Sequence, residues 1–268
     1  MIRGAVPTRW YEHSRRGWVQ VDAEIIEEAL VTIYVNGEEL ATIMSTPHEQ
    51  DKLALGFLKN ESLIQGIEEV EHVHISENGC CVDVWLNHAV SKPERVIITT
   101  GCGGGVTFDD PSLGIEPLQD ELRVSPGVLA RLFNKLQSPD SLYARTRGVH
   151  TAGLVDPIRK KLLVTTEDVG RHNTIDKLLG ICMLEDIETR NRVLLATGRI
   201  SSEMLRKGAL MGCPVVASRN SPTSLSVQVA AAWNITLIGY VRRGSMRVYT
   251  HPQRVGFEEP LTLAVAGD

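Results

Sequence analysis

Apolar and polar residues alternate in the first third of this chain and follow a helical spacing in stretches farther on. In the first third, short alternating runs flank the segments Asn36-Gly37 and Glu77-Asn78-Gly79. An Asn-Gly pair between two such runs is the strongest short-range signal for a β-hairpin. The sequence therefore predicts a polar arm over residues 1–20 and two hairpins, at residues 30–44 and 70–87.

Capping residues mark the starts of two predicted helices. Thr46 can cap a helix over residues 49–60, with Pro47 in its first turn. Ser125-Pro126 begins another helix, whose apolar residues recur at helical spacing. Gly56 lies inside the first of these helices, where it costs about 1 kcal/mol against alanine. We therefore expect close packing at Gly56.

From residue 161 onward, strand and helix patterns alternate. The predicted strands cover residues 161–166, 193–197, 214–218 and 235–240, and the predicted helices cover residues 174–180, 203–211 and 225–232, with Gly180 as a helix stop. Such alternation predicts a mainly parallel sheet with covering helices. Residues 106–125 are polar and contain prolines, which is typical of a linker.

Composition limits the classes of function. Of the 268 residues, 43% are hydrophobic and 23% are charged, and the net charge is −5. These values are typical of a folded protein and disfavour non-specific binding to nucleic acid. With no apolar run of about 18 residues and no recognisable secretory signal, we expect no membrane partner and a cytoplasmic location. The five cysteines form no C-x-x-C, which predicts neither a disulfide framework nor a cysteine-based metal site.

A charged segment separates the strand predicted at residues 161–166 from the helix that follows. It consists of Glu167-Asp168-Val169-Gly170-Arg171-His172-Asn173, and Asp176 comes shortly after it. In α/β proteins, the loops at the carboxyl ends of strands are the usual ligand sites. From the residues alone, two interpretations stay open: a ligand site, or a salt-bridged turn that positions the helix.

Arginines recur in the loops that follow the later predicted strands. They are Arg171, Arg199, Arg219, Arg242 and Arg243, and serine, threonine and glycine residues accompany them. Because the carboxyl ends of parallel strands share one edge of a sheet, we expect these arginines to line one edge. Guanidinium, hydroxyl and free amide donors suit phosphate or pyrophosphate. The sequence therefore predicts an anionic small molecule as ligand.

Cys102 lies in the loop Gly101-Cys102-Gly103-Gly104-Gly105, directly after a strand predicted at residues 96–100. Free backbone amides in such a loop favour a thiolate or another anion. The alternative is a turn whose cysteine has no function. Cys80 and Cys81 lie on a predicted strand, where adjacent side chains point to opposite faces, and we interpret both as structural.

Several blocks of the sequence resemble those of the formate dehydrogenase accessory sulfurtransferases, the FdhD family. The segment 167–173 is the most specific of them. The other blocks are Gly56-Phe57-Leu58 with Glu61, Asp176-Lys177, Thr197-Gly198-Arg199-Ile200-Ser201-Ser202-Glu203-Met204, Ser221-Pro222-Thr223 and Val248-Tyr249-Thr250-His251-Pro252-Gln253-Arg254. Together they extend over nearly the whole chain.

This resemblance implies an α/β protein with two domains. A smaller N-terminal α/β (α+β) domain would cover residues 1–110 and end in the Cys102 loop, and a cytidine-deaminase-like α/β domain would cover residues 111–268. Members of the family are usually homodimers. The implied function is a sulfur relay: a cysteine desulfurase gives sulfur to the chain, which passes it to the molybdenum bis(molybdopterin guanine dinucleotide) cofactor. The sulfurated cofactor then enters the formate dehydrogenase catalytic subunit.

The resemblance also implies roles for individual residues. Cys102 would carry sulfur as a persulfide, which would make the chain a sulfurtransferase with no metal ion of its own. The family segment that contacts the cofactor corresponds here to Val241, Arg242, Arg243, Gly244, Ser245 and Met246. We further expect Arg171, Arg199 and His172 beside the cofactor, and guanine nucleotides such as GDP as its mimics.

Two departures from the related patterns matter. The family usually has C-x-x-C in the cysteine loop, whereas this chain has Gly105 at the second position. One nucleophilic sulfur suffices for persulfide transfer. The alternatives are a chaperone that shields and delivers the cofactor without a covalent relay, and a nucleotide hydrolase or transferase.

The zinc-deaminase signature is also missing. His150 is followed by Thr151-Ala152 rather than by x-Glu, and no C-x-x-C follows Pro214. We therefore expect neither zinc nor deaminase chemistry. His150, His172 and Asp168 are instead candidates for proton handling or for anchoring the loop.

Overall fold

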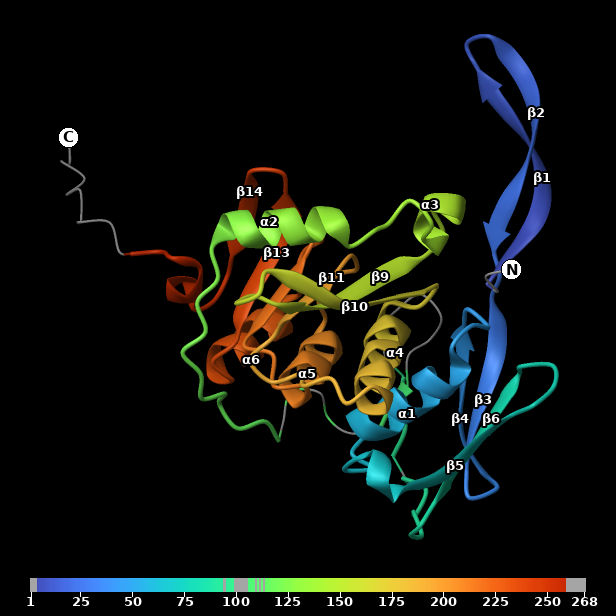
Figure 1. Cartoon of the computed structure of the whole chain (residues 1–268), viewed down its shortest axis with the longest axis horizontal. Coiled ribbons are helices and arrows are strands. Elements are labelled where there is room, and N and C mark those ends of the chain that lie inside the picture. The colour runs from blue at the N-terminus through green and yellow to red at the C-terminus, as the bar shows by residue number, and fades with distance from the viewer. Residues whose placement is uncertain are drawn as a thin grey trace.

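The computed structural model describes residues 4–93, 95–98, 106–108, 110, 112 and 114–258, and Cys102 lies outside this part of the chain. The described residues form mixed α/β structure with two large sheets, a long N-terminal ribbon and one short strand pair (Figure 1). The predicted α/β class is thus confirmed. The domain boundary after residue 110 and the likeness to cytidine deaminases stay predictions.

The first large sheet has the strand order β4-β3-β6-β5. Its strands are β3 (Ala29–Val35), β4 (Glu38–Ser45), β5 (Val70–Ile75) and β6 (Cys81–Leu86). Both predicted hairpins are confirmed, because β3 pairs antiparallel with β4, and β5 with β6. Asn36 and Gly37 have φ values of 52° and 82°, as an Asn-Gly hairpin turn requires. The inward residues Val31 and Ile33 pack with helix α1 (Gln50–Asn60) in one apolar cluster.

Thr46 does not cap helix α1, contrary to the prediction. The residue before the helix is Glu49, which has a φ of 57° and makes no side-chain cap hydrogen bond. The Thr46 hydroxyl instead accepts a hydrogen bond from Val169 N at 3.1 Å, and Thr46 N donates to the Asp168 carboxylate at 3.1 Å. A buried carboxylate needs such donors because no water reaches it. Thr46 therefore fastens the first sheet to the second.

Residues 5–26 form a ribbon rather than the predicted polar arm. Strands β1 (Ala5–Ser14) and β2 (Gly17–Ile26) pair antiparallel along their whole length. The ribbon projects from the body of the protein (Figure 1). The projecting arm was predicted, but its two strands were not, because apolar residues alternate with so many polar ones that no hydrophobic run stands out.

The second large sheet has the strand order β10-β9-β11-β12-β13-β14. Its strands are β9 (His150–Asp156), β10 (Lys161–Asp168), β11 (Val193–Ala196), β12 (Val215–Ser218), β13 (Thr236–Arg242) and β14 (Ser245–Val248). Within this sheet β11, β12 and β13 pair in parallel and the other pairs are antiparallel, so the predicted mainly parallel sheet is wrong. The β9–β10 and β13–β14 turns are too short for a parallel connection.

Four strands of this sheet nevertheless end at one edge. Because β9 runs antiparallel to both β10 and β11, strand β10 has the same direction as β11, β12 and β13. The residues that follow these four strands therefore meet at one edge, together with the start of β9. We call this edge the strand-end edge.

Helices cover both faces of the second sheet (Figure 1). They are α2 (Pro126–Lys135), α4 (Arg171–Leu184), α5 (Ser202–Leu210) and α6 (Ser224–Ala232). The short helix α3 (Leu142–Thr146) lies at the end of the sheet, and 3-10 turns lie at Ile67–Glu69 and Pro252–Val255. Apolar residues of α4, α5 and α6 pack in one cluster with the sheet, and those of α2 pack in another. Residues 115–125 contain no helix or strand, as expected of the linker, although strand β8 (Val106–Thr107) lies at its start. Among the described helices, none is both long and apolar enough to span a bilayer.

Helices α1 and α4 pack closely because each has a glycine where they meet. A Cβ atom on Gly56 would overlap the Asp176 carbonyl, and one on Gly180 would overlap the Lys52 carbonyl. The predicted close packing at Gly56 is thus confirmed. Gly180 does not end the helix, contrary to the prediction, because α4 continues to Leu184. The missing side chain of Gly180 instead leaves room for the α1 backbone.

Gly56→Ala and Gly180→Ala should each destabilise the fold, although alanine is the better helix former by about 1 kcal/mol. We expect overpacking to cost about 3 kcal/mol, because a backbone carbonyl cannot move aside as a side chain can. Urea unfolding measures the loss. Gly127→Ala in α2 is the matched control, since a Cβ there meets nothing within 4 Å and should not lower the midpoint. Wild-type midpoints for both α1–α4 variants would contradict the close packing.

Candidate functional site

The segment 167–173 joins β10 to α4 at the strand-end edge. Asp168 ends the strand, and Arg171 and His172 form the first turn of the helix. All three side chains are buried. Charged groups at this depth require partners, and the partners determine their role.

Asp168 is completely buried and is surrounded by donors. Its carboxylate pairs with Lys177 of α4 at 2.6 Å. It also accepts hydrogen bonds from Ser45 Oγ at 2.7 Å, Thr46 N at 3.1 Å, Gly170 N at 2.7 Å and Asn173 Nδ2 at 2.9 Å. For Asp168, the structure therefore favours the salt-bridged turn that positions the helix.

Glu167 is also used structurally. Its two carboxylate oxygens accept hydrogen bonds from Leu142 N at 2.6 Å and Tyr143 N at 3.1 Å. These donors are the first N–H groups of α3, which have no partner within the helix. Glu167 thereby fixes α3 beside the strand-end edge.

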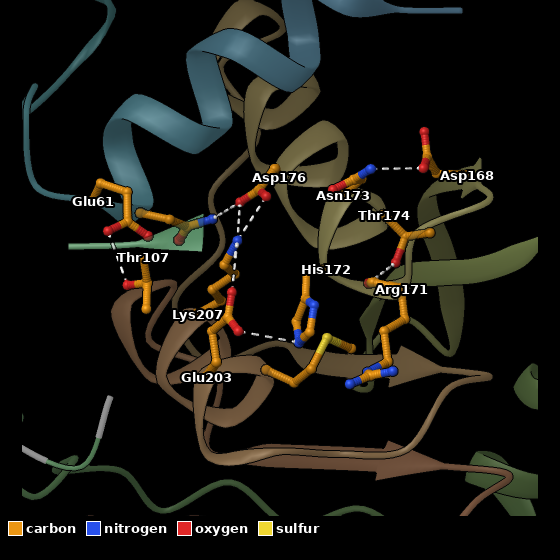
Figure 2. Close-up of polar contacts among 12 residues, drawn as sticks. Glu61, Thr107, Asp168, Arg171, His172, Asn173, Thr174, Asp176, Glu203 and Lys207 are labelled. Atoms are coloured by element: carbon orange, nitrogen blue, oxygen red, sulfur yellow. Dashed lines mark hydrogen bonds and ion pairs between the residues drawn. The ribbon is translucent and has the colours of Figure 1, made fainter. Parts of the chain in front are cut away.

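A second buried ion pair joins α4 to α5. Lys207 Nζ lies 2.7 and 2.6 Å from the two Asp176 carboxylate oxygens, and Asn60 of α1 donates to the same carboxylate at 2.7 Å (Figure 2). Burial lowers the pKa of Lys207, but the carboxylates of Asp176, Glu203 and Glu61 outweigh this effect and raise it, so the ammonium stays charged. The sequence analysis missed Lys207. Its one signal, the i,i+4 spacing from Glu203, is equally typical of a solvated helix face.

His172 packs beside this pair and is neutral. Its Nε2 atom lies 3.3 Å from Ser201 Oγ and 3.3 Å from a Glu203 oxygen. Burial lowers the pKa of His172 well below its ordinary value, and the nearby cations Lys207 and Arg171 lower it further. The contact with Glu203 is therefore made by a neutral ring and is not an ion pair, although the distance would allow one.

Glu61 connects this buried network to the strand that leaves the cysteine loop. Its carboxylate accepts a hydrogen bond from Thr107 Oγ1 at 3.0 Å (Figure 2). It accepts a second one from Phe108 N at 2.8 Å. Burial raises the pKa of Glu61. Thr107 belongs to β8, which pairs with β7 (Ile97–Ile98) on the other side of the loop. The strands that flank the loop are thus anchored to the network, while residues 99–105 lie outside the described part.

The strand-end edge contains a hollow of about 380 Å³. It is lined by Gln137, Tyr143, Val149, His150, Thr197, Arg219, Asn220 and Arg242. The Arg219 guanidinium lies 5.9 Å from the centre of the Phe133 ring, and Arg242 donates to the Arg219 carbonyl at 2.7 Å. Two guanidinium groups beside hydroxyl and amide groups suit an anion such as phosphate, as the sequence predicted for this edge.

His150 lines this hollow and is also neutral. Burial lowers its pKa below the ordinary value, Arg171 lowers it further, and Asp168 opposes the change. A lone histidine in a sequence is usually structural. Its place in the hollow depends on the antiparallel course of β9, which the sequence pattern did not reveal.

The other residues predicted to contact the cofactor do not line the hollow. Arg171 is buried beside the Gly198 backbone, whereas Arg199 and Arg243 are exposed. His172 faces the buried network. The roles of these residues toward a cofactor stay predictions.

The described cysteines include two that are protected from reaction. Burial raises the pKa of Cys182 to about 12 and also raises the pKa of Cys213. Because the thiolate is the nucleophile, neither is suited to sulfur transfer. Cys80 and Cys81 are free and partly exposed. Among the described residues, no group of three or more His, Cys, Asp or Glu side chains could hold a metal ion.

Comparisons with known proteins agree with one another. The sequence model of the FdhD/NarQ family matches residues 26–256. A sulfur carrier protein FdhD from Bacillus pumilus (strain SAFR-032) is 37% identical over 239 residues, covering 87% of this chain and 90% of that protein. One from Staphylococcus aureus (strain MRSA252) is 34% identical, covering 87% and 89%. A crystal structure described as a formate dehydrogenase accessory protein, from Desulfotalea psychrophila, has a TM-score of 0.77 and 26% identity, covering 94% of this chain and 99% of that one.

Lys207→Met should destabilise the fold strongly, because the buried Asp176 carboxylate would lose its counter-ion. Removing one partner of a buried pair costs about 3–5 kcal/mol. Urea unfolding followed by circular dichroism measures the change. Lys52→Met is the matched control, since Lys52 and Asp51 pair with 30% and 27% of their side chains exposed. That pair should contribute no more than about 1 kcal/mol, and equal losses in both variants would contradict the account.

The free energy of unfolding should fall as the pH is lowered from 7 to 5, in part because of His172. Its folded pKa is lowered, whereas the unfolded value is about 6.5. The stabilising contribution is therefore complete above about pH 6.5 and is lost on acidification, at about 1.4 kcal/mol per pH unit. His172→Gln should flatten this slope. The pKa of His88 is raised by the Ala89 carbonyl and Glu69, so His88→Gln should steepen it; an unaltered slope in His172→Gln would argue against a neutral buried ring.

Proposed function

Because this chain belongs to the FdhD/NarQ family, we propose that it carries sulfur as a Cys102 persulfide to the molybdenum bis(molybdopterin guanine dinucleotide) cofactor. The family supports the general role of a sulfur carrier, and the structural relative supports an accessory role toward formate dehydrogenase. The proposal includes a cysteine desulfurase as donor, the formate dehydrogenase catalytic subunit as recipient, a homodimer and a cytoplasmic location.

One observation carries the proposal: the strand that leaves the Cys102 loop is held by the buried network beside the strand-end edge. Glu61 binds Thr107, which comes five residues after Cys102. Five residues span at most roughly 18 Å even when fully extended. Glu61 also contributes to the charge of Lys207, which borders the first turns of α4 and α5. This reach supports the proposal that Cys102 acts near the helix starts at this edge.

In the first step, the Cys102 thiolate attacks the outer sulfur of the desulfurase persulfide. A new S–S bond forms on Cys102 while the original S–S bond breaks, and the desulfurase cysteine leaves as a thiolate. The exchange needs no further oxidant or reductant. A single cysteine suffices, so Gly105 in the second position of the loop does not prevent this step.

In the second step, the terminal sulfur of the Cys102 persulfide passes to the cofactor bound at the strand-end edge. The S–S bond breaks and Cys102 is left as a thiolate, while the reduced metal of the cofactor supplies the two electrons that convert the transferred sulfur to a sulfido ligand. In the hollow, Arg219 and Arg242 bind a phosphate of one guanine dinucleotide in this proposal. Arg243 follows in the exposed turn between β13 and β14 and can reach an adjoining phosphate. Charge-assisted hydrogen bonds from guanidinium to phosphate are among the strongest in proteins.

The rival function is a chaperone that binds and delivers the cofactor without carrying sulfur itself. Gly105 favours it, because a second loop cysteine that could resolve or shield a persulfide is missing there. The two functions share the cofactor site and differ in the chemistry of Cys102. They therefore differ in whether the protein gains sulfur.

Cys102→Ala should abolish the gain of one sulfur atom that we expect when the protein is incubated with a cysteine desulfurase and cysteine. Intact-mass spectrometry measures the gain. Cys80→Ala is the matched control, because Cys80 is partly exposed and should not be needed. Both variants can also be expressed in a strain without its own accessory protein. There, Cys80→Ala should restore formate dehydrogenase activity and Cys102→Ala should not. A wild-type protein that binds GDP but gains no sulfur would support the chaperone.

A further inference from the structure

The imidazole ring of His150 has no hydrogen-bond partner in the part of the chain that the structure describes. His150 is the first residue of β9, and its half-buried side chain lines the hollow at the strand-end edge. By contrast, the rings of His88 and His172 both contact neighbouring side chains. Polar groups inside a protein are usually paired. An unpaired ring beside Arg219 and Arg242 is therefore available to a ligand.

The His150 ring is neutral in the free protein. Burial lowers the pKa of His150 below its ordinary value, and Arg171 lowers it further. Asp168 opposes this change but has the smallest effect of the three. Its carboxylate already pairs with Lys177 at 2.6 Å. The ring therefore contributes no charge of its own to the hollow.

Charged and titratable groups face His150 from the elements around it. They are Asp168 on β10, Arg171 and His172 on α4, Tyr143 of α3 with Arg147 stacked on its ring, and Arg219 and Arg242 in the hollow. Asp168 is the one carboxylate of this set. Glu167, its neighbour in the chain, has both oxygens committed to the first N–H groups of α3. The surroundings of His150 thus carry an excess of positive charge, which an anion would balance.

An anion held by Arg219 and Arg242 changes the balance of charge at His150. A negative charge within about 4–6 Å favours the protonated form of an imidazole. Once protonated, the ring donates through both nitrogens and forms the stronger, charge-assisted kind of hydrogen bond with phosphate. The anion and the proton then each bind more tightly in the presence of the other, because such coupling is reciprocal.

We propose that the hollow binds its anionic ligand together with one proton, which His150 takes up. The proton comes from the solvent, and no bond within the ligand is made or broken. The complex thus carries one positive charge more than the free protein and the free ligand together. This inference rests on the anion site of the proposed function and adds the way in which that site is regulated. It requires nothing of the sulfur chemistry.

The direction of the pH dependence follows from the neutral ring. As the pH falls from about 8 to about 6.5, the affinity for the anion should rise by up to about tenfold per pH unit, because one proton accompanies each anion. At lower pH the ring is protonated before the ligand arrives, and the dependence should level off. Loss of the proton at high pH favours release of the ligand.

Isothermal titration calorimetry of the full chain with diguanosine pyrophosphate tests the proposal. The pyrophosphate of this probe does not titrate near neutral pH, so any proton that is taken up belongs to the protein. Titrations at about pH 7 in buffers of different ionisation enthalpy give the number of protons as a slope. We expect an uptake that approaches one proton per site. Guanosine, which lacks the phosphates, is the matched ligand and should cause none.

His150→Gln should abolish the proton uptake and flatten the pH dependence, because glutamine forms hydrogen bonds but cannot gain a charge. Its affinity should approach the wild-type value near pH 8 and fall several-fold below it near pH 6.5. His88→Gln is the matched control, since His88 pairs with Glu69 at 2.7 Å beside the first sheet. This control should take up the proton as the wild type does.

Three results would overturn the proposal. Binding of the dinucleotide without proton uptake would exclude the coupling and leave the anion site of the proposed function intact. Undiminished uptake in His150→Gln would assign the proton to another group. A wild-type protein that does not bind the dinucleotide would remove the anion site itself, whereas sulfur gain, measured by mass spectrometry, reports separately on the relay. The wild-type titrations need no variant, so they decide the question of uptake even if His150→Gln misfolds.

Discussion

Two buried lysine–aspartate pairs on helix α4 determine how the parts of this protein fit together. Lys177 pairs with Asp168 beneath the end of β4, and Asp176 pairs with Lys207 of α5. Buried ion pairs of this kind are poor sources of net stability, because the cost of desolvation offsets most of the attraction. They do, however, strongly disfavour any arrangement that leaves one charge unpaired. Where the glycines bring α1 and α4 together, Asn60 of α1 also donates a hydrogen bond to the Asp176 carboxylate.

The same constraint sets the chemistry of the strand-end edge. A charged Lys207 and a neutral His172 lie close together in the interior. Burial disfavours the imidazolium of His172, whereas the carboxylates of Asp176, Glu203 and Glu61 keep Lys207 charged. His150 and His172 are therefore neutral, and the positive charge is concentrated on lysine and arginine. Glu61 extends the network to the base of the Cys102 loop. One buried network thus joins helices α1, α4 and α5 to the strands that flank the Cys102 loop.

The sequence predicted the hairpins and most helices, because their signals are local: Asn36-Gly37 determines a turn whatever surrounds it. It also located the charged segment and the arginine-bearing loops. It could not predict that Thr46 would donate a hydrogen bond to a carboxylate 122 positions away instead of capping α1. Nor could it predict that Lys207 would lie inside the protein. Both features depend on tertiary contacts, which the spacing of apolar residues along the sequence does not reveal. The course of β9 was missed for the same reason, and with it the position of His150 in the hollow.

The central claim is that the anion site at the strand-end edge and the Cys102 thiol act on one bound molecule. A crystal structure of the chain with GDP tests it most directly. The account predicts phosphate oxygens against Arg219 and Arg242, with the Cys102 sulfur on the same side of the second sheet. GDP bound at the opposite edge, near the turn between β9 and β10, or a Cys102 sulfur facing away from the nucleotide, would contradict it.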